Sequence, residues 1–410
     1  MPLLSLRAVA LAAALLPVLG TAASLNLEEA LERAVQRSEA IRAGHAAVTS
    51  ASQGAQASGK LPDPMLGVSL ENLPVTGPDR LHTGRESMTM KRIALSQEWL
   101  SAEKRSLRTA AASATVARES ASVAAAAAET RLQTALAYVD AFYASAALKV
   151  AASSEEIARQ AAETARARLA AAGTAAPDVL VLVAAHGAAQ DESAEVRQQA
   201  AAAGVTLARW TGLTADALSS PVLGPVVPEQ EFVQRHPGVV VRQREIDVAR
   251  QEAAVTASNR SPNWTWEVAY AQRSGFSDMA SVGVRIPLPV APGARQDRET
   301  SSKLALVEKA EAELGEAVIA AQAEYRVRRS DASRLEERIR AFEKNVVAVA
   351  RQRTAAATAG YGSNQGALAM VFEARQAELV AQRKLLNLQR DLARAHAQLT
   401  LNAVKPEELR

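Results

Sequence analysis

The stretch "KLPDPMLGVSLENLP" (Lys60 to Pro74) decides the fold, because here the chain alternates apolar residues with small or polar ones. Leu66, Val68 and Leu70 share one face of this segment. A period of two predicts a short strand with one apolar side. Most of the remaining chain is typical of helix, so the partners of this strand must come from distant segments or from other chains.

The second half of the chain repeats the plan of the first. "VQRSEAI" (Val35 to Ile41) resembles "VQRHPGV" (Val233 to Val239), and the same offset lays Pro64 on Pro262. It also lays the first strand on "NWTWEVAYAQ" (263–272), which alternates in the same way. Such an internal repeat predicts two similar structural units.

Each of these strands is followed by a polar loop and a further strand. The further strands are "MTMKRIALSQ" (88–97), whose alternation is imperfect, and "MASVGVRIPL" (279–288). Gly and Pro in the loop at 76–87, and Gly in the loop at 274–278, are typical of turns. The sequence therefore predicts two strand–loop–strand units.

Long helices fill the rest of both halves. The segment 101–170 contains no Pro and no Gly, and 294–359 contains only Gly315. A series of residues from Leu314 to Val349, apolar except for Arg328, alternates steps of four and three, which predicts coiled-coil packing with a left-handed supercoil. At ~1.5 Å per residue, each helix would be about 100 Å long.

A turn and a second helix follow each long helix. Gly in the breakers "AAGTAAPDVL" (171–180) and "AGYGSNQGAL" (359–368) predicts left-handed C-caps, and Pro177 suits the first helical position. We expect the following organisation: signal peptide 1–23; first repeat 24–211, with strands about 64–73 and 88–98, long helix about 101–170 and tip turn about 171–177; inter-repeat linker 212–228; second repeat 229–403, with strands about 262–273 and 278–288, long helix about 294–359 and tip turn about 360–366; C-terminal tail 404–410.

The first residues indicate export. Arg7 precedes the apolar run "AVALAAALLPVL" (8–19), and "GTAAS" (20–24) is a small-residue cleavage site, as in secretory signal peptides. A membrane anchor is the alternative, but the run is shorter than the ~20 residues that span a bilayer. The chain has no cysteine, and its net charge of +3 is spread along the sequence, which gives no basic patch for nucleic acid.

Four strands in one chain leave open edges, which neither water nor lipid tolerates. Three copies would supply 12 strands, an even number in the range of outer-membrane barrels. Trp264, Trp266 and Tyr270 would be membrane-interface aromatics. The opposite faces would line a wet lumen with Ser69, Glu71, Thr265, Glu267 and Arg285. A small soluble β-domain on a helical stalk is the alternative.

The whole plan after the signal peptide resembles the TolC-like outer-membrane efflux protein family. "LNLEEALERAV" (25–35) is similar to the family's opening helix, and "GTAAPDVLVLVAA" (173–185) and "YGSNQGALAMVFEAR" (361–375) are similar to its two tip segments. "LPDPMLGVSLENLPVTGPD" followed by "MTMKRIALSQE" resembles the heavy-metal efflux branch of these outer-membrane factors. The chain departs from many relatives in lacking an N-terminal cysteine for lipid attachment.

The resemblance implies a mostly α fold with a four-stranded β contribution, and a homotrimer with a 12-stranded β-barrel in outer-membrane lipid on an α-helical periplasmic tunnel. It implies a passive channel that works with a periplasmic adaptor (membrane fusion) protein and an inner-membrane resistance–nodulation–division pump, in a Gram-negative bacterium. The tips would contact the adaptor and form a gated entrance. The residues carried over are Gly173, Thr174, Pro177, Asp178, Val179, Leu180, Tyr361, Gly362, Ser363, Gly366 and Leu368.

Two carboxylates near the tips are candidates for a cation-favouring ring at the tunnel entrance. Asp178 lies in the first turn after Pro177, where it also suits the helix dipole, and Glu373 lies further along the second tip helix. Met88 and Met90 could pass soft Cu(I), although lipid contact on one strand face is the simpler interpretation.

The sequence contains no catalytic motif, and its five histidines have no short-range partner histidine. We therefore expect no enzyme activity, no cofactor, no resident metal site and no nucleic-acid partner. Heavy-metal cations are the expected cargo. The alternatives are a drug-efflux or type I secretion channel and, from another class, a soluble periplasmic coiled-coil scaffold.

Overall fold

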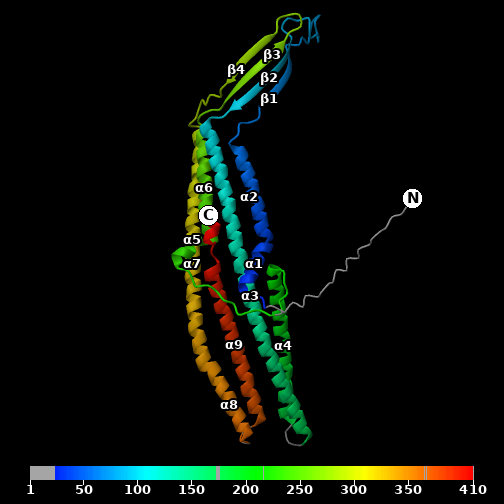
Figure 1. The fold of residues 1–410 in the computed structure, drawn as a ribbon, viewed down its shortest axis with the longest axis vertical. Coiled ribbons are helices and arrows are strands. Elements are labelled where there is room, and N and C mark those ends of the chain that lie inside the picture. Colours follow the sequence, from blue (N-terminus) through cyan, green and yellow to red (C-terminus); the bar gives the residue numbers. More distant parts are fainter. Residues whose placement is uncertain (1–23, 172–175, 216, 364, 366, 410) are drawn as a thin grey trace, which may run out of the picture.

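The computed structural model describes residues 24–171, 176–215, 217–363, 365 and 367–409, so the expected signal peptide lies outside it. The molecule is long and thin, with a sheet at one end of a layer of helices (Figure 1). In chain order the elements are α1 (Leu27–Arg37), α2 (Glu39–Ser58), β1 (Met65–Glu71), β2 (Met90–Trp99), α3 (Ala102–Ala170), α4 (Ala176–Thr211), α5 (Glu229–Arg235), α6 (Pro237–Ser258), β3 (Trp264–Gln272), β4 (Met279–Arg285), α7 (Gln296–Phe342), a π-helical turn (Glu343–Val347), α8 (Ala348–Gly362), α9 (Leu368–Leu401) and a 3₁₀ turn (Pro406–Leu409).

The four strands form one antiparallel sheet in the order β1-β2-β3-β4. Both predicted strand–loop–strand units pair within themselves, and β2 also pairs with β3, from Lys91 opposite Gln272 to Trp99 opposite Trp264. This central pairing joins the two halves of the chain. The predicted mostly helical fold with a small four-stranded contribution is confirmed.

Three helices, α1, α2 and α3, begin after residues whose side chains cap a free N–H group. The Asn26 Oδ1 accepts a hydrogen bond from the Glu29 N–H at 2.8 Å, and the Ser101 hydroxyl accepts one from the Lys104 N–H at 3.2 Å. Ser38 does the same for α2. These caps explain where α1, α2 and α3 start.

The longest helix, α3, forms the spine of the molecule. It packs against α2, α4, α6 and α9, and its many alanines allow this close approach. A stretch of α3 is long and apolar enough by composition to cross a membrane. One third (33%) of that stretch is buried against the rest of the chain.

The helices form a layer with two outer edges. Near the sheet, α2 packs on α3 and α6 packs on α7, while towards the other end α4 packs on α3 and α8 packs on α9. Figure 1 shows α2 and α4 along one side of the molecule and α7 and α8 along the other. The sheet has the same arrangement, with β1 at one edge and β4 at the other.

The predicted single helix at about 294–359 is interrupted by the π-helical turn. A π turn inserts extra residues into the helical repeat and rotates the following face. Val346 and Val349, which the heptad pattern places in the seam, are 40% and 55% exposed, whereas Val347 is 3% exposed. The predicted seam is therefore wrong from this turn onwards.

Irregular segments cross the middle of the helical layer and are called the collar here; they comprise the residues around Leu25 and Ser219 and the linker near Val226. Tyr138 is fully buried there, and its hydroxyl lies 2.7 Å from the Leu25 carbonyl oxygen and 2.8 Å from that of Ser219. In the segment expected to be a linker, Val226 packs against Ala332 and Ala395. The collar thus lies against one face of the layer.

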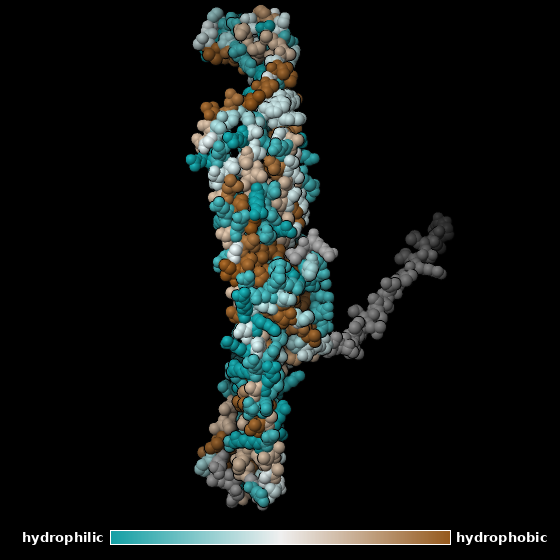
Figure 2. Space-filling model, turned by 90° about the vertical axis from the view of Figure 1, so that its left-hand side faces the viewer, coloured by the Kyte–Doolittle hydropathy of each residue, from teal (hydrophilic) through white to brown (hydrophobic). Residues whose placement is uncertain are grey.

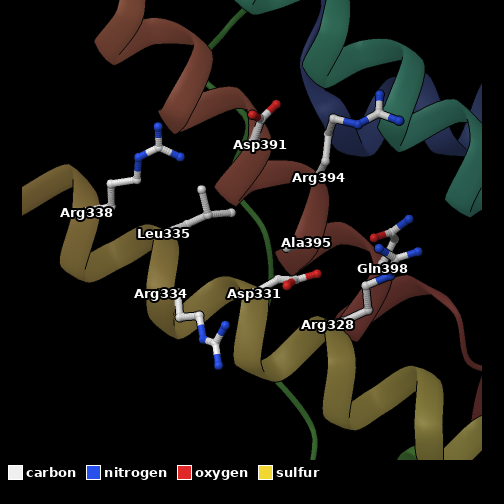
Figure 3. A pocket seen from close by; sticks show the side chains of 9 residues that line it. All are labelled: Arg328, Asp331, Arg334, Leu335, Arg338, Asp391, Arg394, Ala395 and Gln398. Carbon is white, nitrogen blue, oxygen red and sulfur yellow. The ribbon is translucent and has the colours of Figure 1, made fainter.

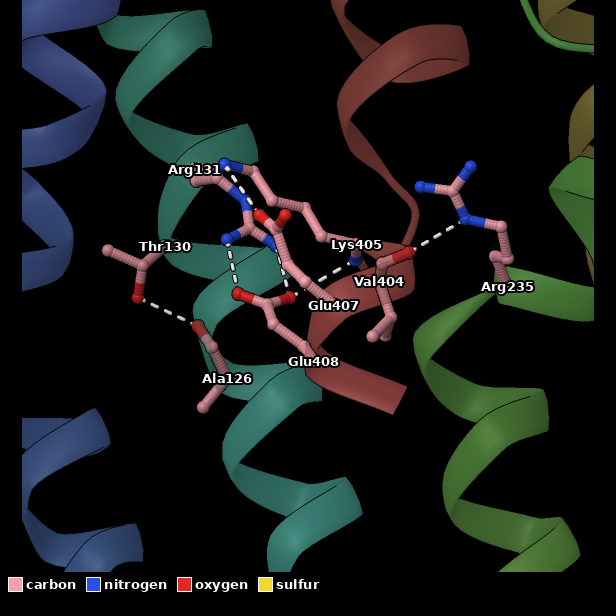
Figure 4. Close-up of polar contacts among 8 residues, drawn as sticks. All are labelled: Ala126, Thr130, Arg131, Arg235, Val404, Lys405, Glu407 and Glu408. Carbon is pink, nitrogen blue, oxygen red and sulfur yellow. Dashed lines mark hydrogen bonds and ion pairs between the residues drawn. The ribbon is translucent and has the colours of Figure 1, made fainter. Parts of the chain in front are cut away.

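The C-terminal tail is part of this collar (Figure 4). The guanidinium of Arg131, on α3, makes two hydrogen bonds to the Glu408 carboxylate, at 2.7 and 2.9 Å. Val404 and Arg235 exchange a further pair of hydrogen bonds, each 2.8 Å long. The tail therefore ties α3 to α5.

Candidate functional site

One face of the sheet is apolar and open to the surroundings. The register places Leu66, Leu95, Val268 and Val282 in one row across the four strands, and Val68, Ile93, Tyr270 and Ala280 in the next. The larger side chains in both rows are exposed, and Val282 is 79% exposed. An apolar patch of this extent marks a surface for lipid or for another protein.

The other face carries charge. Ser69, Glu71, Thr265, Glu267 and Arg285, the residues expected to share a wet surface, all lie on this face. Arg92 joins them and forms ion pairs with Glu71, at 3.5 Å, and with Glu267. Arg285 pairs with Glu267 at 2.5 Å, so a chain of opposite charges crosses all four strands.

Sequence reasoning missed Arg92 because the alternation of its strand is imperfect.

The structure also changes the interpretation of the two methionines near Arg92. Met90 opens β2 on the charged face opposite Glu71, and Met88 precedes the strand, so lipid contact by both methionines on one strand face is wrong.

Both edges of the sheet are open within the described chain. β1 pairs only with β2, and β4 pairs only with β3. Each outer edge therefore presents unpaired backbone N–H and C=O groups, which can accept another strand.

The aromatic residues lie at two different levels of the apolar face. Trp264 packs against Trp99 with ring centroids 5.9 Å apart, at the end of the sheet nearest the helices. Trp266 follows on the same face, and Tyr270 lies six residues from Trp264, or about 20 Å at ~3.3 Å per residue. The Tyr270 hydroxyl bonds to Asp278 in the far loop. The three residues thus mark both borders of one apolar band.

The opposite end of the molecule carries the tips. Pro177 is the second residue of α4, Val179 is buried and Leu180 is exposed. Tyr361 and Gly362 end α8, and Ser363 is its C-cap with a φ of −89°. The left-handed glycine cap expected here is therefore wrong. Leu368 begins α9, whereas Gly173, Thr174, Gly366 and the Asp178 side chain lie outside the described residues.

A polar contact connects the two helical hairpins at this end. Arg168, in the last turn of α3, donates a 2.7 Å hydrogen bond to the Tyr361 hydroxyl, and its guanidinium lies 5.9 Å from the centre of the Tyr361 ring. Sequence reasoning selected Tyr361 but missed Arg168. Glu373 forms an ion pair with Arg353 of α8 at 2.8 Å, so its charge is partly compensated.

Several solved structures of outer-membrane proteins have a similar fold. VceC from Vibrio cholerae matches with 18% identity and a TM-score of 0.73, over 92% of this chain and 96% of that one. The outer-membrane channel CmeC from Campylobacter jejuni matches with 12% identity and a TM-score of 0.76, over 92% and 85%. The outer-membrane channel MtrE from Neisseria gonorrhoeae matches with 14% identity and a TM-score of 0.69, over 92% and 88%.

The chain has the fold of outer-membrane channels. No family model and no curated protein matches its sequence. Within this fold, the amphipathic sheet and the two tips occupy opposite ends of the molecule, as Figure 1 shows. The apolar sheet face and the tips are therefore separated by about the length of the helical layer.

Proposed function

We propose that the chain forms a passive outer-membrane channel of a tripartite efflux system, working with a periplasmic adaptor and an inner-membrane resistance–nodulation–division pump. The observation that carries the proposal is the sheet, which has an exposed apolar face, a charged opposite face and two open edges. A sheet of this kind is stable in lipid only when it closes into a barrel. The fold supports a channel over an enzyme.

Closure requires further copies of the chain. In a trimer, the β4 edge of each copy would pair with the β1 edge of the next, and α7 would lie beside α2 and α4 of its neighbour. Ile319 and Val327 on α7 are exposed, as are Val181 and Val205 on α4. Figure 2, which views the molecule from the α7 side, shows hydrophobic patches along the helical body. These patches favour a lateral interface between the helical layers of neighbouring copies.

Fractionation of cell envelopes separates the channel from the soluble-scaffold alternative. A channel should remain in the outer membrane after a salt wash and run as a trimer that dissociates only on heating. Monomeric protein in the aqueous periplasmic extract would refute the proposal.

Heavy-metal cargo is the finer part of this proposal, and it rests on the sequence of the first strand–loop–strand segment. Among the described residues, no group of three histidine or acidic side chains is placed to hold a metal ion. The cargo is therefore tested in cells. A deletion strain should become sensitive to metal salts and recover with the gene, whereas sensitivity to drugs alone would favour a drug-efflux channel.

The contact between Arg168 and Tyr361 provides a prediction for the tips. Tyr361→Phe removes the hydroxyl that Arg168 bonds and keeps the ring. An exposed bond of this kind stabilises by about 0.5–1 kcal/mol, so the closed entrance should open roughly 2–5 times more often. Single-channel recordings measure the open fraction. An open fraction equal to the wild type would show that this contact does not hold the entrance closed.

The pair formed by Glu373 and Arg353 provides a second prediction. Arg353→Gln frees the Glu373 carboxylate, so cation preference should rise, and Glu373→Gln should lower it. Both side chains are exposed, so each change should shift the permeability ratio by less than about twofold at ~0.15 M salt. Reversal potentials measure the ratio. Shifts in the same direction for both variants would exclude Glu373 as an entrance carboxylate.

A further inference from the structure

A groove between α7 and α9 is lined by nine residues, four of which are arginines (Figure 3). Its volume is about 500 Å³. Four arginines in its wall, Arg328, Arg334, Arg338 and Arg394, face only two aspartates, Asp331 and Asp391.

Much of the negative charge near the groove is already engaged. Arg390 pairs with Asp391 at 2.8 Å, and Arg394 pairs with Asp140 of α3. Among the described residues, Arg328, Arg334 and Arg338 form no salt bridge. The Arg328 Nε is buried and has no hydrogen-bond partner in the described chain. The groove therefore has an excess of positive charge and an unused donor.

Two arginines of the groove, Arg334 and Arg338, lie on the side of α7 away from the collar, whereas Arg328 lies about 60° around the helix from Tyr325. The Tyr325 hydroxyl donates to the Val227 carbonyl oxygen at 3.0 Å, which fixes the side that faces the collar. At about 100° per residue, Arg334 and Arg338 point roughly 140–180° away from Tyr325 around the helix axis. In Figure 3 the thin trace of the linker passes behind both helices, while the labelled side chains lie in front.

This geometry assigns the groove to the inner wall of the tunnel, an assignment that rests on the proposed function. A collar on the inside would fill the tunnel, so the face without the collar must enclose it. Three copies would repeat the groove around one level of the tunnel. We propose that the grooves form a positively charged band that binds multivalent anions and makes the channel prefer anionic cargo over bare cations. A metal would then pass as a complex with net negative charge.

The test compares two double variants in reconstituted channels. Arg334→Gln with Arg338→Gln removes two charges from the groove. Arg329→Gln with Arg340→Gln removes the same charge from the same helix, at exposed positions only about 40–60° from Tyr325 and therefore on the collar side. The chloride-to-potassium permeability ratio is measured from reversal potentials in salt gradients.

The groove variant should lower this ratio by roughly 2–5-fold near ~0.1 M salt, and the effect should shrink near ~1 M, where the Debye length falls to about 3 Å. The collar-side variant should leave the permeability ratio unchanged. The variant Arg334→Lys with Arg338→Lys keeps both positive charges, so its ratio should equal that of the wild type. If the groove variant does not form trimers, Arg338→Gln alone should still give part of the decrease.

Equal ratios for the groove and collar-side variants would overturn the anionic band while leaving the channel intact. Absence of any conductance in the wild type would instead refute the proposed function, and the band with it. Block of the current by inorganic pyrophosphate, lost in the groove variant only, would confirm that the grooves bind multivalent anions.

Discussion

Val282→Arg should nearly abolish trimers in the outer membrane, whereas Ser281→Arg should leave them abundant. The two residues are neighbours on β4, and both are exposed, but they lie on opposite faces of the sheet. Val282 belongs to the apolar row with Leu66 and Val268. An arginine on the lipid face costs about 2–4 kcal/mol near the bilayer midplane, but little on a wet face.

The comparison is measured as the heat-dissociable trimer in outer-membrane fractions, at matched expression. For Val282→Arg the trimer should fall by a factor of ~30 or more, which corresponds to about 2 kcal/mol. Val282→Ala serves as a control for lost side-chain volume and should keep most of the trimer. If Ser281→Arg were the harmful change, the lipid and lumen faces would be assigned the wrong way round.

Glu408→Gln should destabilise the protein because it leaves Arg131 without its counter-charge. The Arg131 side chain is only 6% exposed and Glu408 is partly buried. Breaking a buried pair by changing one partner costs about 3–5 kcal/mol, and the partial exposure of Glu408 places the expected loss at the lower end of that range. In the wild type the Lys405 N–H donates a 3.1 Å hydrogen bond to the Glu408 carboxylate. Glutamine still offers an oxygen to this N–H, so the loss of stability measures the effect of removing the charge. Urea unfolding at neutral pH measures the change.

The double change Arg131→Met with Glu408→Leu should recover most of the lost stability, because it removes both buried charges together. If the double variant were no more stable than Glu408→Gln, the packing of the tail and not its charge would hold the collar.

The pair of Arg131 and Glu408 should also make the free energy of unfolding depend on pH in the acidic range. Burial raises the Glu408 pKa, but hydrogen bonds and charge from Arg131 outweigh this effect, so the pKa in the folded protein is lowered. The stabilisation is therefore complete above the unfolded-state pKa of ~4.3 and is lost as the pH falls through the lower folded-state value. Glu408→Gln should lose this part of the acid sensitivity, which unfolding measured across the acidic range would show.

The strands and long helices could be predicted from the sequence because their patterns are local. The alternation around Leu66 and Val68 requires only a period of two, and the absence of Pro and Gly defines 101–170 as one helix. The pairing of β2 with β3 could not be predicted in this way, because it joins segments from different halves and no local pattern encodes it.

The details of the site depended on similar long-range contacts. Tyr361 stood out in the tip sequence, but its partner Arg168 lies far away along the chain. The π-helical turn at 343–347 follows an uninterrupted heptad pattern, so Val346 and Val349 were placed in the seam. The arginines of the groove are scattered over α7 and α9, and only the packing of these helices brings them together.

Electron cryo-microscopy of the detergent-extracted protein tests the central claim most directly, since that claim is closure of the sheet by other copies. We predict a particle of three chains in which the β4 edge of each copy pairs with the β1 edge of the next and the charged face lines the lumen. A particle with one chain, or a sheet whose two edges stay open, would contradict the account.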